Sequence, residues 1–267
     1  MKKTLIALAV AASAAVSGSA MAADWVRNGT NGSVDLGGTL SVASNMTPWE
    51  VTLGDATTEL NAPIKEGQTS VEFSLNKPTA VLGIRNASTA GFSGQASGSG
   101  ITPNISYGNA VDLDHFNGSV TTIALDVTDG NDTSRKIGTM TADFMAVAVS
   151  GYQWDTGRWG QQMLTANNES HAFFGGVPKK SDGQVADIIS KVEVAFNGLR
   201  DHYQVPSDTQ WYGASPELLN VTTSKYWSFY GSAISNEKPI KLKLDAPAGG
   251  NADISWKASL PITVSYQ

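Results

Sequence analysis

Apolar and polar residues alternate along much of this chain with a period of two residues. From Ser33 to Val42 the even positions are apolar or Gly, and the odd positions are polar or Gly. Because successive side chains of a strand point to opposite faces, this run predicts a strand with one apolar face. The same alternation recurs at residues 71–75, 123–127 and 240–244. Turn-forming residues separate these runs, so the pattern predicts an all-β sandwich.

The longest alternating run lies at the C-terminus, between Asp253 and Tyr266. Its apolar positions are Ile254, Trp256, Ala258, Leu260, Ile262, Val264 and Tyr266. The unbroken register predicts one strand or two collinear strands. Pro261 has no backbone N–H group, so we expect a sheet edge, a bulge or a bend at that position.

One segment has the period of a helix instead. From Gln184 to Leu199 the apolar residues are mostly three or four positions apart. Ser181 and Gln184 fit a capping box at its start, and Gly198 fits a C-cap at its end. The helix lies in residues 151–225, where the two-residue period is mostly lost. We interpret that stretch as an insertion on the β framework.

The first 22 residues have the layout of a secretory signal peptide. Lys2 and Lys3 precede an apolar stretch from Leu5 to Val16, and the triplet Ala20 to Ala22 has small residues at the cleavage site. The apolar stretch is shorter than the roughly 20 residues that a membrane-spanning helix needs. We therefore expect an exported, soluble mature chain that begins at Ala23.

Charge and cysteine content further limit the class of protein to which this chain can belong. The whole chain carries 18 basic and 24 acidic side chains and a net charge of −6. Binding to nucleic acid or to an anionic membrane needs clustered Lys and Arg, so we expect no nucleic-acid partner. There is no cysteine, so the exported fold must depend on core burial and strand pairing without a disulfide.

Both ends of the chain resemble a known family. The leader begins Met1-Lys2-Lys3-Thr4, and the mature start contains Trp25-Val26 and the run from Asn31 to Gly38. These residues resemble the major fimbrial subunits of the kappa class of chaperone–usher fimbriae, the thin fibrillae of enteric bacteria. Tyr266, one residue from the end of an alternating strand, is similar to the C-terminus of chaperone–usher pilins in general. The resemblance covers about 20 residues at each end.

The resemblance implies an immunoglobulin-like pilin sandwich, residues 43–267, that lacks its last strand and is completed by a neighbouring subunit. It also implies an inserted receptor-binding region with short helices. Residues 23–42 would be the donor segment. The side chains implied to face the neighbour's groove are Val34, Leu36, Gly38, Leu40 and Val42. The residues implied to lie beside the groove, and to contact a periplasmic chaperone, are Leu260, Ile262, Val264 and Tyr266.

The implied function is that of a structural major subunit of an adhesive fimbria. Its partners would be identical subunits, the periplasmic chaperone, the outer-membrane usher and a host glycoconjugate. The chain would pass through the periplasm to the cell surface. A minor or non-adhesive coat subunit of the same system is the alternative.

Two residue patterns depart from those of many chaperone–usher pilins. Ile254 stands where they have a Gly about fourteen residues from the C-terminus, and the disulfide that many carry is absent. The alternation of residues 33–42 is also compatible with a first strand of the chain's own sandwich, because the pattern does not say which molecule the strand pairs with.

Catalytic and metal-binding patterns are missing. His115, His171 and His202 are far apart and lack metal-ligand spacing. There is no cysteine nucleophile, nucleophile elbow or P-loop. The pairs Asp112 with Asp114 and Asp129 with Asp132 lie in turn-like sequence, where Asp is favoured by turn geometry alone. We expect no enzyme activity, no cofactor and no bound metal.

Sugar recognition requires an aromatic face and polar groups that fix the hydroxyls. The candidates within eight residues are Tyr152, Trp154, Arg158 and Trp159. Two further aromatic groups, Trp211 with Tyr212 and Tyr226-Trp227 with Tyr230, lie at the far end of the insertion. Tyr and Trp are also common core residues, so a structural role for each is the competing interpretation.

Overall fold

A long central strand organises the described part of the chain, which in this computed structural model comprises residues 47–267 except 56, 58–59, 182–186 and 251–252. The predicted leader and donor segment lie outside these residues. The large sheet has eleven strands. They are β1 (Trp49–Leu53), β2 (Ser70–Phe73), β3 (Thr79–Asn86), β4 (Phe92–Ser93), β6 (Val120–Asp129), β7 (Lys136–Gln153), β8 (Trp159–Leu164), β9 (Trp211–Ser215), β10 (Lys225–Ile234), β11 (Ile240–Leu244) and β12 (Trp256–Ala258). A second sheet pairs β5 (Pro103–Ser106) with β13 (Thr263–Tyr266).

Strand β7, with 18 residues, is the centre of the large sheet. The strand order along the main path is β1-β3-β10-β7-β11-β2, and β6 and β8 also pair with β7. All pairs are antiparallel except β8 with β9. Residues 136–144 of β7 alternate between more and less buried positions, whereas residues 144–151 are buried on both faces. The second half of the strand is therefore covered from two sides.

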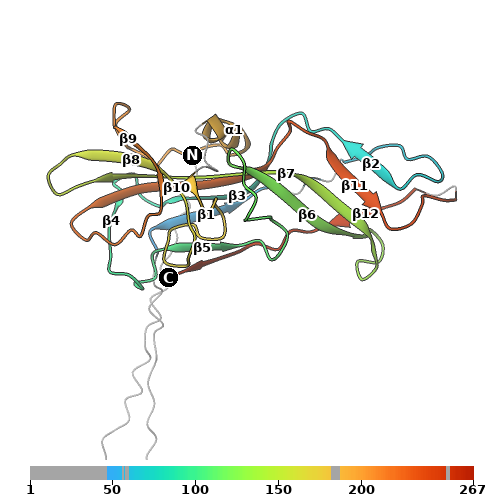
Figure 1. Cartoon of the computed structure of the whole chain (residues 1–267), viewed down its shortest axis with the longest axis horizontal. Helices are drawn as coiled ribbons and strands as arrows, with labels where there is room; N and C mark the ends of the chain where they lie inside the picture. Colours follow the sequence, from blue (N-terminus) through green and yellow to red (C-terminus); the bar gives the residue numbers. More distant parts are fainter. Residues whose placement is uncertain (1–46, 56, 58–59, 182–186, 251–252) are drawn as a thin grey trace, which may run out of the picture. The chain divides into compact units, whose positions relative to one another are not determined.

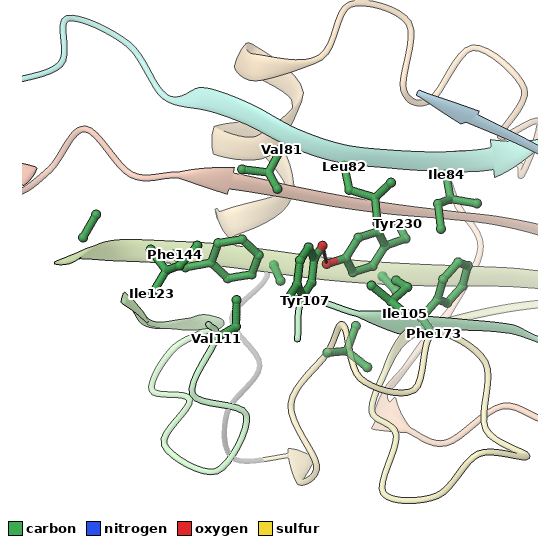
Figure 2. Close-up of a cluster of buried hydrophobic side chains, with 14 of the residues drawn as sticks. Val81, Leu82, Ile84, Ile105, Tyr107, Val111, Ile123, Phe144, Phe173 and Tyr230 are labelled. Atoms are coloured by element: carbon green, nitrogen blue, oxygen red, sulfur yellow. Dashed lines mark hydrogen bonds between the residues drawn. The ribbon is translucent and has the colours of Figure 1, made fainter. Parts of the chain in front are cut away.

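One cover is the second sheet, which packs on the large sheet and closes the main core (Figures 1 and 2). Phe144, Tyr230 and Phe173 are fully buried there. The hydroxyl of Tyr107 lies 2.7 Å from that of Tyr230 and 2.8 Å from Oγ of Ser232, so these three hydroxyl groups are paired inside the core.

The other cover is α1 (Asp187–Ala195), which packs on the opposite face of β7 and β10. The contact is close because β10 has Gly231 at this point. A Cβ atom there would lie 2.4 Å from Cγ1 of Val192. The structure confirms that the stretch predicted as a helix, from Gln184 to Leu199, contains one. Within the described residues it is shorter, and Gly198 follows it in the left-handed region, with φ of 78°. Its nine residues are too few to cross a membrane.

The C-terminal run forms two strands that belong to different sheets. β12 pairs with β6 in the large sheet, and β13 pairs with β5 in the second sheet. Pro261, where we expect a sheet edge, a bulge or a bend, lies in the break between the two strands. The described chain is mostly β-strand with one short helix, which confirms the all-β, immunoglobulin-like sandwich.

Residues 151–225, interpreted above as an insertion, contain β8, α1 and β9. β8 and β9 extend the large sheet beyond β7 instead of forming a separate sheet. β9 also carries one residue more than β8 between their paired positions, Gln161 with Trp211 and Met163 with Ala214. This bulge interrupts the outer edge of the sheet.

Candidate functional sites: an apolar groove and an aromatic hairpin

A cavity of about 1480 Å³ lies between the large sheet and the C-terminal segment. Its floor consists of apolar side chains from the core face of four strands. They are Val81 on β3, Ile123 and Leu125 on β6, Met140 on β7, and Ile240, Leu242 and Leu244 on β11. These floor side chains are buried and belong to the main core, so the cavity borders the core directly.

Two parts of the chain form the walls of this groove. One comprises residues 53–55, 57 and 60–64, and the other runs from Asp253 to Ile262. Six apolar side chains of the walls pack against the core but are only partly buried, namely Leu60, Ile64, Trp256, Ala258, Leu260 and Ile262. Ile254 remains 37% exposed. The face of the C-terminal run that its alternation predicts to be apolar is therefore incompletely covered.

The walls also have unpaired backbone. β12, in the C-terminal wall, pairs with β6 alone among the described strands. Within the same residues, Leu60–Ile64 take part in no backbone hydrogen bond. An extended strand laid in the groove would meet free N–H and C=O groups on both sides, which is the arrangement used in strand addition.

The four C-terminal residues implied to border a groove divide into two pairs. Leu260 and Ile262 line the cavity. Val264 and Tyr266 lie on β13, pair with Ile105 and Pro103, and pack partly buried against the core outside the cavity. The implied donor residues 34–42 lie outside the described residues.

The second site is the hairpin between β7 and β8. Gln153 pairs with Trp159, and a tight turn follows, in which the N–H of Gly157 donates to the carbonyl of Trp154 over 2.9 Å. Gly157 has φ of 78°, a value that glycine adopts without strain. The N–H of Trp154 also donates to the carbonyl of Arg158, 3.0 Å away. These two residues therefore face each other across the hairpin.

The pairing separates the four predicted receptor residues onto two faces of the sheet. Tyr152, Trp154 and Arg158 share one face, because directly paired and alternate positions point the same way. Trp159 points to the other face, where its ring lies 4.7 Å from that of the buried Trp227. The indole of Trp227 donates to the carbonyl of Thr89 over 2.9 Å. Three of the four predicted receptor residues therefore form one cluster, and Trp159 lies on the other face of the sheet.

A residue from β9 completes the aromatic face. The ring centroid of Trp154 lies 4.9 Å from that of Tyr152 and 6.2 Å from that of Tyr212, with both pairs edge-to-face. The guanidinium carbon of Arg158 lies 5.7 Å from the centroid of the Trp154 ring. Tyr212 is 43% exposed, so this face is open to a ligand. In the sequence Tyr212 belongs to a separate aromatic group.

Glu217, which sequence reasoning did not select, stands behind this face. Its Oε1 accepts the backbone N–H groups of Leu218 and Leu219, each over 3.0 Å, and its Oε2 accepts from Nε2 of Gln162 over 3.3 Å. Burial raises the pKa of this carboxyl. Burial, followed by the charge of Glu217, raises the pKa of Tyr152 to about 12. No motif marks a lone Glu in a loop, so the sequence contained no signal for it.

The three histidines take part in local contacts. Nδ1 of His115 lies 2.8 Å from Oδ2 of Asp112, and Nδ1 of His202 lies 2.7 Å from the carbonyl of Asn86. His171 contacts the side chain of Asn168 over 3.1 Å. Each contact stays within its own loop or joins a loop to a strand.

The carboxylates of Asp129 and Asp132, assigned above to turn-like sequence, take part in turns. Oδ1 of Asp129 accepts the N–H of Asn131 over 2.8 Å, and this hydrogen bond is the main cause that lowers the pKa of Asp129. Arg135 pairs with its other oxygen. In the described part of the chain, no group of three or more His, Asp or Glu side chains is arranged to hold a metal ion.

Comparison with known proteins extends the resemblance from the two ends to the whole chain. A family model described as "Fimbrial, major and minor subunit" matches residues 1–267. The F41 fimbrial protein of Escherichia coli is 27% identical over an alignment that covers 100% of both chains. The K88 fimbrial proteins AC and AD of the same species are 26% and 29% identical, again over 100% of each chain.

Proposed function

This chain belongs to the family of major and minor fimbrial subunits, and from that premise we propose that it polymerises by donor-strand exchange into an adhesive surface fimbria. Residues 33–42 of one copy would occupy the groove of the next. We further propose that a periplasmic chaperone occupies the groove before assembly, and that an outer-membrane usher exports the growing fibre.

The groove is the observation that carries this proposal. It combines an apolar floor, two half-covered walls and unpaired backbone on both sides. The alternating run from Ser33 to Val42 has the complementary pattern, with four bulky apolar side chains on one face. Burying them contributes about 1.5–3 kcal/mol each, or roughly 6–12 kcal/mol together, before the cost of ordering the arm.

Two variants test donor-strand exchange. Deletion of residues 23–42 is expected to abolish fibres while leaving a groove that still accepts an added peptide with the sequence of residues 33–42. A chain that carries a copy of this segment after Gln267 is expected to be a stable monomer that neither polymerises nor binds the peptide. Fibres formed by the deletion variant would contradict the proposal.

The adhesive part of the proposal concerns the face formed by Trp154, Tyr212 and Arg158. Exposed aromatic rings beside hydrogen-bonding groups match the apolar and hydroxyl-bearing surfaces of a pyranose. We propose that this face binds a host glycan. In assembled fibres, Trp154→Ala and Tyr212→Ala should abolish agglutination of target cells. Thr156→Ala, an exposed change in the same turn, serves as the matched control.

Agglutination that survives both aromatic substitutions would refute this site. The family description covers minor subunits as well, so a minor or non-adhesive coat subunit is the second candidate. The number of copies per fibre, measured on a gel of surface extracts, separates a major from a minor subunit.

We also propose that the chain is not an enzyme, because its histidines make only local contacts. Turnover of a bound glycan by purified fibres would contradict this.

A further inference from the structure

The end of the β7–β8 hairpin holds a guanidinium that has no carboxylate partner. Arg85, Arg135 and Arg200 each lie within ion-pair distance of an Asp or Glu. Arg158 is different, since no carboxylate oxygen of the described residues lies within 4 Å of it, and its side chain makes no hydrogen bond to them. Among the described arginines, Arg158 alone lacks an ion pair.

The hairpin positions this cation. The backbone pairing of Trp154 with Arg158 places the two side chains on one face, and the guanidinium lies over the Trp154 ring at 5.7 Å. Stacking on an aromatic ring restricts the rotamers of an Arg side chain and leaves its N–H donors directed outward. The donors form a planar fork that matches the two oxygens of a carboxylate or a sulfate.

The acidic groups near this face do not neutralise Arg158. Glu217 already accepts three hydrogen bonds, two from backbone N–H groups and one from Gln162. Asp155 lies in the same turn, is exposed and makes no ion pair with Arg158. A stack of Arg158 on Trp154 that only stabilised the turn would have the same geometry as one that binds an anion. A measurement of ligand binding is therefore needed to distinguish the structural role from the binding role.

We propose that Arg158, stacked on Trp154, binds the anionic group of an acidic sugar, either the carboxylate of a sialic acid or a sulfate ester, within the receptor glycan. This inference rests on the adhesive function proposed above and adds the charge of the ligand to it. The rings of Trp154 and Tyr212 would contact the pyranose ring, while the guanidinium N–H groups would donate hydrogen bonds to the oxygens of the anion.

The test uses assembled wild-type fibres and three immobilised probes, which are lactose, 3′-sialyllactose and 3′-sulfolactose. We expect at least one anionic probe to bind more tightly than lactose. Arg158→Gln should weaken that binding about tenfold to a hundredfold, as expected for loss of a charge-assisted hydrogen bond, and should leave binding of lactose unchanged. Arg158→Lys, which keeps the charge without the planar fork, should give an intermediate loss.

Lys225→Gln is the matched control. Lys225 of β10 is exposed and pairs directly with Gln153 of β7. It therefore lies at the same end of the sheet as Arg158, on the face opposite to Trp154 and Arg158. Removing this charge should leave all binding unchanged. An equal loss in Lys225→Gln and Arg158→Gln would mean that only net charge matters, which overturns the subsite.

The cell assay identifies the source of the anion. Loss of agglutination after sialidase treatment assigns the carboxylate of a sialic acid, and loss after sulfatase treatment assigns a sulfate. If Trp154-dependent binding to lactose is retained and Arg158→Gln changes nothing, the acidic subsite is overturned while the adhesive function stands. If wild-type fibres bind neither cells nor any probe, both fail together.

Discussion

The groove predicts how substitutions in a grafted donor segment change the stability of a chain that fills its own groove. The variant lacks residues 23–42 and carries a copy of residues 33–42 after Gln267, joined by a flexible linker. Gln267 is held by backbone hydrogen bonds to Thr102 and Gly100. The linker turns the chain back past β13 (Thr263–Tyr266), so that the copy lies antiparallel to residues 262–253 in the groove.

The magnitude follows from the groove lining. An apolar residue of the copy that enters the groove covers Leu260, Ile262 and the floor beneath them. Truncating it, as in Leu36→Ala of the copy, should cost about 2–5 kcal/mol. Asp35→Ala of the copy points away and should change stability by less than about 0.5 kcal/mol. Gly38→Leu should cost about 1–3 kcal/mol by overpacking if the floor is high opposite that position.

Thermal and urea unfolding of the monomeric variants measure this pattern. For a domain of this size the Leu36→Ala loss corresponds to a drop in Tm of roughly 4–20 °C. The costs should alternate along the copy with a period of two residues. Equal costs at odd and even positions, or a graft that fails to raise Tm above that of the arm-deleted chain, would refute donor-strand closure of this groove.

Three further predictions concern the scaffold and the pH response. Tyr107→Phe leaves the hydroxyl of Tyr230 with fewer partners in the core, so the free energy of unfolding in urea should fall by about 1–3 kcal/mol. Gly231→Ala places a Cβ atom against Val192 and should cost about 1–3 kcal/mol by overpacking, with lower amide protection in α1. Burial raises the pKa of Glu217, so its stabilising contribution is present below its unfolded pKa and is lost as pH rises through its folded pKa. Urea unfolding of wild type and Glu217→Gln from about pH 4 upward should show a difference in stability that changes in this direction, and a constant difference would contradict it.

Several strands and the C-terminal wall of the groove could be predicted because their signal is local. The alternating runs at residues 71–75, 123–127 and 240–244 fall on β2, β6 and β11. Pro261, which has no N–H group, lies where the C-terminal run is interrupted between β12 and β13. That the two halves of this run belong to different sheets depends on pairing with β6 and β5, which are more than 100 residues away.

The aromatic site was harder to predict, for two physical reasons. Trp154 and Trp159 are five positions apart, and a turn between them reverses which positions share a face. Gly157 marks that turn, so the separation could have been derived once the hairpin was located. The approach of Tyr212 and Glu217 depends on the parallel pairing of β8 with β9 and on a loop contact. No periodic pattern encodes such non-local contacts.

The two candidate sites lie at opposite ends of the same strand. Met140 of β7 lines the groove, and Tyr152 of β7 belongs to the aromatic face; twelve residues of strand separate them by about 40 Å. Figure 1 shows β8 and β9 at the end of the sheet remote from β2, β11 and β12. A strand that fills the groove would therefore leave the hairpin uncovered, and every subunit of a fibre could present one. Weak individual sites would then act together, because binding at one copy raises the effective concentration of ligand at the next. This separation also makes the two proposals independent: a substitution in the hairpin should leave assembly intact, and self-closure of the groove should leave monovalent glycan binding intact.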